Sequence, residues 1–111
     1  MVSLRPNYAQ PHKPPLSDLT VHHSVDGTKG RYFIRHEKGE SALTYSIMSP
    51  EMVIADHTEV AAGLEGKGVG LVLLAQFIKD ARANGLKIVP LCPFVNAQRR
   101  KHPEWADAFS V

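Results

Sequence analysis

The order of apolar and polar residues in the first half of the chain is typical of β-strands. Residues 31–36 form an apolar-rich run with turn-forming residues on both sides. In residues 41–48, small or polar positions separate the apolar residues Leu43, Tyr45 and Ile47, which is the period of a half-buried strand. Residues 52–60 follow a Ser-Pro turn and form a third run, rich in β-branched residues. We therefore expect three antiparallel strands in a meander.

The pattern becomes helical after residue 68. Residues 69–84 carry apolar side chains three or four positions apart, and Gly85 follows as the expected left-handed terminator. Residues 86–91 are almost continuously apolar, as in a buried parallel strand. The second half thus predicts a right-handed β-α-β crossover, followed by a last helix at about residues 94–101. The fold class expected is α/β with a mixed sheet.

Length and proline content limit the domain organisation. A chain of 111 residues with 43% apolar and 22% charged residues has the size and composition of one globular domain. Four of its eight prolines lie near the N-terminus, at positions 6, 11, 14 and 15. Because proline fixes φ and removes a backbone donor, residues 1–24 are expected to form an arm outside the core, and residues 25–111 a single domain.

Charge and cysteine content exclude several classes of protein. The net charge of +2 is too small to favour nucleic acid as a partner. Cys92 is the only cysteine, which excludes an intrachain disulfide and a cysteine-rich zinc site and favours a reducing, cytoplasmic location. No apolar run approaches the length needed to cross a bilayer, so no membrane association is expected. The histidines lack the spacing of metal ligands, and we expect no metal.

A glycine-rich segment between a predicted strand and a predicted helix could bind phosphate. Unpaired N–H groups at a helix N-terminus attract anions, and glycines let the backbone approach them closely. The alternative is a tight turn that only packs the helix against the strand. Spacing excludes two familiar phosphate loops, because Gly66-Lys67 is not followed by Ser or Thr, and the dinucleotide fingerprint lacks its third glycine and its acidic residue.

Five ordered motifs of residues 31–105 resemble a compact branch of the GCN5-related N-acetyltransferases, which has His-Thr, glycine-rich and Cys-Pro-Phe motifs. They are Ala42-Leu43-Thr44-Tyr45, His57-Thr58-Glu59-Val60, Gly66-Lys67-Gly68-Val69-Gly70, Pro90-Leu91-Cys92-Pro93-Phe94-Val95 and His102-Pro103-Glu104-Trp105. The resemblance implies a minimal acetyltransferase fold with acetyl-CoA or CoA as cofactor. It places Glu65, Gly68 and Gly70 in the register of the pyrophosphate loop, where Glu65 departs from the usual Gln or Arg.

The resemblance also implies how the cofactor is held. The strands that end near Val60 and Leu91 are expected to splay, and the amide-rich pantetheine arm is expected to add to the exposed edge like another strand. The cofactor-binding residues expected are Val60, Gly66, Lys67, Gly68, Val69, Gly70, Arg99 and Arg100. For the two arginines, a solvated helix face is the alternative.

The thioester is then expected between His57 and Cys92, the candidate catalytic residues. His57 alone could be a histidine on a sheet face, and Cys92 a small buried hydrophobe. Cys92 precedes a helix whose free N–H groups could favour its thiolate. Two routes stay open: Cys92 accepts the acyl group with His57 as base, or His57 deprotonates an incoming amine directly.

The function expected is acetyl transfer to an amine. Because only a hairpin precedes residue 52 in the expected domain, the acceptor groove should be open, which suits a protein lysine, a protein N-terminus or a polyamine. A non-catalytic module that binds CoA or acetyl-CoA is the main alternative, and a protein-interaction domain is the third. A monomer or weak dimer is expected.

Overall fold

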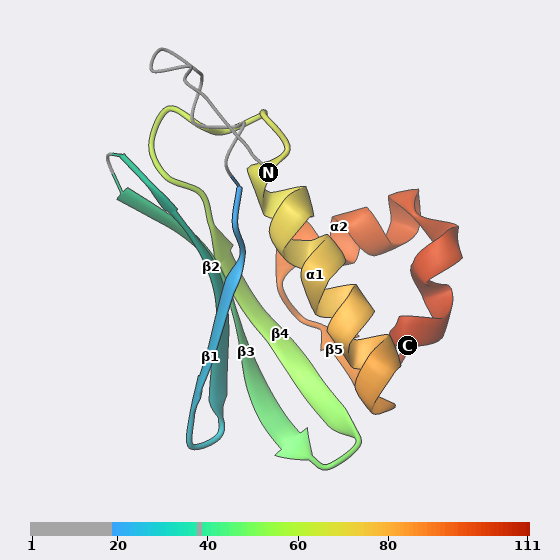
Figure 1. Ribbon diagram of the computed structural model, residues 1–111. Coiled ribbons are helices and arrows are strands. Elements are labelled where there is room, and N and C mark those ends of the chain that lie inside the picture. The colour runs from blue at the N-terminus through green and yellow to red at the C-terminus, as the bar shows by residue number, and fades with distance from the viewer. Residues whose placement is uncertain (1–18, 38) are drawn as a thin grey trace, which may run out of the picture.

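Five strands form one mixed sheet, and the helices lie on one of its faces (Figure 1). The computed structural model describes residues 19–37 and 39–111. The strands follow chain order across the sheet, antiparallel except for the last pair. They are β1 (His22–Asp26), β2 (Lys29–His36), β3 (Gly39–Ser49), β4 (Met52–Glu59) and β5 (Lys87–Pro90). The expected α/β class and the meander are confirmed.

The strand β1 was not expected from the sequence. It includes residues 22–24, which the sequence analysis assigns to the N-terminal arm, while residues 1–18 of that arm lie outside the described residues. All five of its residues are exposed, so β1 has no apolar alternation to reveal it. Nonlocal contacts hold it: the His23 ring stacks on Tyr32 at 4.2 Å, and its Nε2 lies 2.6 Å from the Tyr45 hydroxyl.

The side chain of Tyr45 reaches β1 because β2 has a glycine in its path. Gly30 pairs with Tyr45 across the two strands. A Cβ atom at Gly30 would lie 2.0 Å from Cζ of the tyrosine ring, far inside van der Waals contact. The missing side chain of Gly30 thus allows Tyr45 to cross the inner face of β2 and meet His23.

The predicted crossover follows the meander. Helix α1 spans Val69–Asn84, as expected, and ends at Gly85, where φ is 68° and the amide donates to the carbonyl of Ala81. Helix α2 (Pro93–Lys101) begins one residue earlier than expected, with proline at a position where no amide donor is needed. The 3₁₀ helix η2 (Pro103–Ala108) was not expected.

The core lies between the sheet and the helices. Its largest fully buried side chains include Tyr32 and Phe77, whose rings lie 5.3 Å apart. The Tyr32 hydroxyl donates to Asp80 of α1 at 2.8 Å. Burial, together with this carboxylate, raises the pKa of Tyr32 above its ordinary range, so the phenol stays protonated and keeps the bond. This bond and the ring contacts fix α1 against β2 and β3.

A second polar contact fixes η2 to α1. Arg82 donates from Nε and Nη2 to the two carboxylate oxygens of Asp107, at 3.0 and 2.7 Å. The hydrogen bond from Arg82 lowers the pKa of Asp107. The C-terminal residues then cover the free side of β5, where Ser110 donates its amide to the carbonyl of Ile88. The sheet edge at β5 is therefore covered beside Ile88.

Replacing Gly30 by alanine should destabilise the protein by roughly 1–3 kcal/mol, because the added methyl group collides with the Tyr45 ring. Urea unfolding measures the loss. The double variant Gly30→Ala with Tyr45→Leu should lose less unfolding free energy than the sum of the two single variants, because leucine is smaller than tyrosine and leaves room for the added methyl group. Additive losses would show that the two residues do not compete for this space.

Candidate functional site

The glycine loop presents an open helix N-terminus. Gly66 and Gly68 have φ values of 79° and 83°, and a Cβ atom on either would meet nothing within 4 Å. Gly68 is the N-cap residue of α1, no side chain caps the helix, and its first turn contains no acidic residue. The first amides of α1 therefore have no partner within the helix, and the positive end of its dipole is uncompensated. This arrangement can bind an anion.

A pocket of 250 Å³ lies at this helix N-terminus. Its lining contains most of the cofactor-binding residues expected from the sequence: Val60, Gly66, Gly68, Val69 and Gly70. Lys67 is exposed in the same loop but does not line the pocket. Leu64, Leu71, Phe94 and Gln98 complete the lining and were not among the expected residues.

Two contacts shape the loop. A Cβ atom at Gly70 would lie 2.9 Å from Cζ of Phe94, so the glycine lets α2 pack closely against the start of α1. The carboxylate of Glu65 accepts a hydrogen bond from the amide of Gly63 at 3.0 Å. Glu65, which departs from the family's usual Gln or Arg, therefore stabilises the loop itself.

The strands β4 and β5 separate beside the pocket, as the expected splay requires. Their parallel pairing ends at Ala55 and Pro90, after which the amide of Cys92 donates to the carbonyl of Ala55 at 2.9 Å. Strand β4 continues to Glu59 and pairs there with β3. Among the described residues no strand pairs with the other edge of residues 56–59, which can therefore accept an extended ligand.

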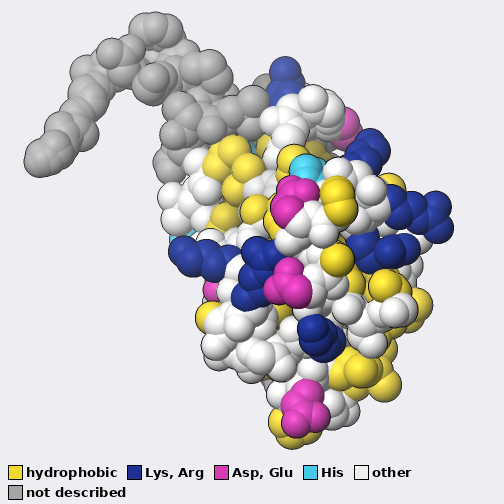
Figure 2. Space-filling model, turned by 90° about the vertical axis from the view of Figure 1, so that its right-hand side faces the viewer, with side chains coloured by type: hydrophobic (Ala, Val, Ile, Leu, Met, Phe, Trp, Pro, Cys, Tyr) yellow, Lys and Arg dark blue, Asp and Glu magenta, His cyan; other side chains and the backbone are white. Residues whose placement is uncertain are grey.

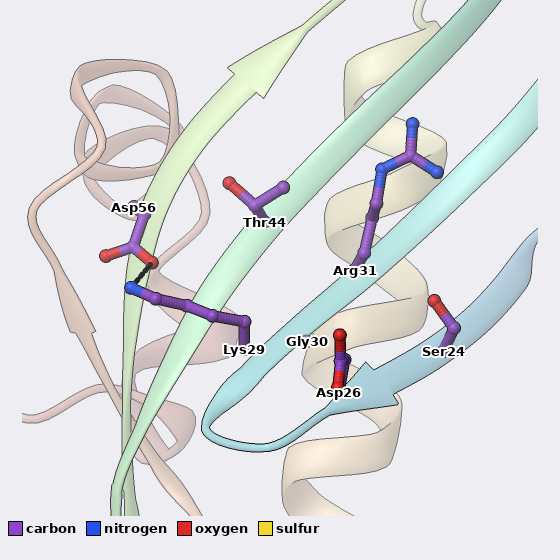
Figure 3. A pocket seen from close by; sticks show the side chains of 7 residues that line it. All are labelled: Ser24, Asp26, Lys29, Gly30, Arg31, Thr44 and Asp56. Carbon is purple, nitrogen blue, oxygen red and sulfur yellow. Dashed lines mark ion pairs between the residues drawn. The ribbon is translucent and has the colours of Figure 1, made fainter.

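A β-bulge at Asp56 reverses the direction of the side chains in the last part of β4. Tyr45 pairs with Ala55, whereas Thr44 pairs with His57, so Asp56 is the extra residue. Paired residues share a face of the sheet, and the Thr44 side chain points to the face away from α1 (Figure 3). The exposed His57 therefore lies on this outer face, and Thr58, paired with the buried Leu43, lies on the inner face.

The expected pair of His57 and Cys92 is thus not brought together as one hydrogen-bonded unit. Cys92 is 2% exposed, and its Sγ lies 3.3 Å from Oγ1 of Thr58. Cys92 does precede a helix, as expected, since it is the N-cap residue of α2. The bulge, which the sequence does not reveal, places Thr58 instead of His57 at the cysteine. The two candidates lie on opposite faces of the splayed strand.

The two arginines expected to reach phosphate lie on other sides of α2. Phe94 and Gln98 line the pocket, and a rotation of about 100° per residue turns Arg99 and Arg100 away from that line. Arg99 also donates twice to Oδ1 of Asn96, at 3.1 and 3.0 Å. Lys101, three residues after Gln98, shares the pocket side of the helix. Figure 2 shows the side of the molecule on which α2 and η2 lie, and several basic side chains are exposed there.

The described residues contain neither a metal site nor a membrane-spanning helix. Within residues 19–37 and 39–111, no three His, Cys, Asp or Glu side chains are grouped so as to hold a metal ion. The helices in this part of the chain are too short or too polar to cross a membrane.

Comparison with known proteins identifies the fold. The family model of the GCN5-related N-acetyltransferases matches residues 31–108, which include the glycine loop and the splayed strands. The chain belongs to this family. A GCN5-like protein from Staphylococcus aureus, solved in solution by NMR, is 28% identical and superposes with a TM-score of 0.68. The match covers 85% of this acetyltransferase-family chain and 90% of the other. No curated protein matches the chain.

The burial of Cys92 predicts a slow thiol. Native protein should react with Ellman's reagent at least about 100-fold more slowly than protein unfolded in urea, because reaction requires local opening. A Leu91→Cys variant in a Cys92→Ala background is the matched control, since Leu91 is 66% exposed, and its thiol should react rapidly. Equal rates for the two positions would show that Cys92 is accessible.

Proposed function

We propose that this member of the family is an acetyl-CoA-dependent N-acetyltransferase that acts on an amine. The observation that carries the proposal is the pocket at the N-terminus of α1, which Val60 joins to the open edge of β4. The pocket suits a diphosphate, and the open strand edge suits an amide-rich arm. Acetyl-CoA contains both of these groups. The lone unpaired Cys92 fits a reducing, cytoplasmic setting for this activity.

Backbone groups would hold most of the cofactor. The free amides at the start of α1 would bind the diphosphate, with Gly66 and Gly68 leaving space for it. The exposed Lys67 and Lys101 flank the pocket and supply positive charge. The open edge of residues 56–59 would pair with the pantetheine amides. When bound, the cofactor supplies the acyl thioester.

The geometry favours direct transfer with His57 as base. His57 is exposed on the outer face, so it can accept the proton from an incoming ammonium group and leave the amine free to attack the acyl carbon. Cys92 is buried against Thr58, and its use as a nucleophile would first require β4 and α2 to separate. The amine forms the new C–N bond, and the thiolate that leaves takes up a proton.

A non-catalytic CoA-binding module is the second candidate. One observation favours it: among residues 19–37 and 39–111, His57 has no hydrogen-bond partner that would orient its ring. A base without such a partner is held less well for proton transfer. Both candidates require cofactor binding, and only turnover separates them.

Cofactor binding can be tested with two glycines at opposite ends of α1. Gly68→Ala and Gly85→Ala place alanine at φ values of 83° and 68°, so each should lose about 1 kcal/mol of stability. Only Gly68→Ala should weaken CoA binding, by about tenfold or more, because only its methyl group enters the phosphate site. Isothermal titration calorimetry measures both affinities. Equal weakening would mean that lost stability, not the loop, causes the effect.

Turnover of acetyl-CoA with a lysine-containing peptide separates the two routes. His57→Ala should lower kcat by about 100-fold, and Cys92→Ala should lower it by less than about threefold, because the base is exposed and the thiol is buried. Transfer is followed by release of free CoA thiol and by peptide mass. Loss of activity in Cys92→Ala alone would establish the cysteine route. No transfer by wild type, with CoA still bound, would leave only the module.

A further inference from the structure

A second pocket lies on the outer face of the sheet, where no helix within residues 19–37 and 39–111 covers it. It measures 460 Å³ and is hollowed across four strands (Figure 3). Its lining is Ser24, Asp26, Lys29, Gly30, Arg31, Thr44 and Asp56. We name it the outer groove. The pocket at the glycine loop lies elsewhere, beside α1 and α2.

The outer groove leads to His57. Thr44 lines the groove and pairs directly with His57, and Asp56 is the neighbour of His57 in the chain. Because Asp56 is the extra residue of the bulge, His57 lies on the outer face together with it. A ligand in the groove would therefore approach the histidine from the side opposite Cys92 and α1.

The lining of the outer groove holds two cations and two carboxylates, but each cation already has a carboxylate partner. Lys29 lies 3.9 Å from Asp56 and donates to Ser46, and Arg31 donates to Glu40 at 2.5 Å, with Arg35 near the same carboxylate. In the described part of the chain, the carboxylate of Asp26 has no ionic or hydrogen-bond partner. Neither has the carboxylate of Glu59, which lies two residues beyond His57 on the same face. A partner with positive charge can neutralise both.

We propose that the outer groove binds the acceptor, and that the acceptor is an extended polypeptide segment. One lysine of this segment would lie at His57, and a second basic residue would pair with Asp26. This rests on the proposed transferase function. Strands about 4.8 Å apart put β1 and β4 about 14 Å from one another. Ser24 lies opposite His57 across Arg31 and Thr44, so Asp26 is displaced from that position by two residues, about 7 Å along the strand. An extended chain spans the resulting separation of about 16 Å in about five residues, which sets the spacing between the two basic residues.

A polypeptide fits this groove better than a polyamine. The floor of the groove carries Lys29 and Arg31, and an all-cationic chain would have to lie over both. An uncharged backbone crosses them without that repulsion, and the hydroxyls of Ser24 and Thr44 can bond to its amides. Positive charge is then needed only at the two ends, where the carboxylates lie.

The test exchanges charge on both partners. Two peptides carry one acceptor lysine and, about five residues away, either arginine or glutamine. The proteins are wild type, Asp26→Asn and the matched control Glu51→Gln, which removes an exposed carboxylate in the turn between β3 and β4. Wild type and Glu51→Gln should prefer the arginine peptide by about fivefold in kcat/KM at low salt, and Asp26→Asn should show no preference. Acetyl-CoA affinity should be equal in all three.

Several outcomes would overturn the proposal. They are a preference that survives in Asp26→Asn, no preference in wild type, a higher kcat/KM for spermidine than for the arginine peptide, and dimerisation through this face seen by sedimentation. Peptide binding followed by the amide resonances of Ser24, Lys29 and Thr44 needs no turnover. If acetyl-CoA does not bind but these resonances shift with the arginine peptide and not in Asp26→Asn, the transferase function fails and the groove assignment holds.

Discussion

The early end of the pairing between β4 and β5 is the constraint on which the site depends. Pro90 has no amide to continue the ladder, and the amide of Cys92 takes the carbonyl of Ala55 instead. Strand β5 then turns into α2, while β4 runs on to Glu59 with one edge unpaired. An unpaired edge inside a sheet usually invites aggregation, but here it lies beside a pocket and the start of α1. The proposed cofactor site is therefore an opening in the sheet itself.

The bulge at Asp56 determines on which face of β4 each of the neighbours His57 and Thr58 lies. Without it, the alternation of the strand would put His57 on the inner face with the buried Ala55. With it, the inner face receives the small Thr58 beside Cys92, and the outer face receives His57 next to the outer groove. In the proposed function, the cofactor and the acceptor would therefore approach opposite sides of one strand.

Much of the fold could be predicted because its signals are local. The period of α1, its glycine terminator and the glycines of the loop all lie within a few residues of the structure they determine, and the structure confirms the helix from Val69 to Asn84. Strand β1 could not be predicted, since its exposed residues are held by His23 against Tyr32 and Tyr45, far along the chain. The helix η2 depends likewise on Arg82 and Asp107.

The candidate site was predictable to the same extent. The pocket gathers Val60 and four residues of the glycine loop, which are close in sequence. The relation of His57 to Cys92 was not predictable, because Met52, Val53 and Ile54 are all apolar and show no alternation from which a bulge could be read. Gln98 could have been found, since it lies four residues after Phe94 on the same side of a predicted helix.

The fold also explains why so small a domain can present two open sites. The residues that face both sites are backed by a single core, in which Val69 and Leu73 anchor the start of α1 and Leu43 and Ala55 anchor the ends of the strands. Because the anchors are buried and many of the proposed binding groups are backbone amides, little conformational entropy of those groups would be lost when a ligand binds. The rigidity needed for recognition comes from the core, and the surface needs no further domain to supply it.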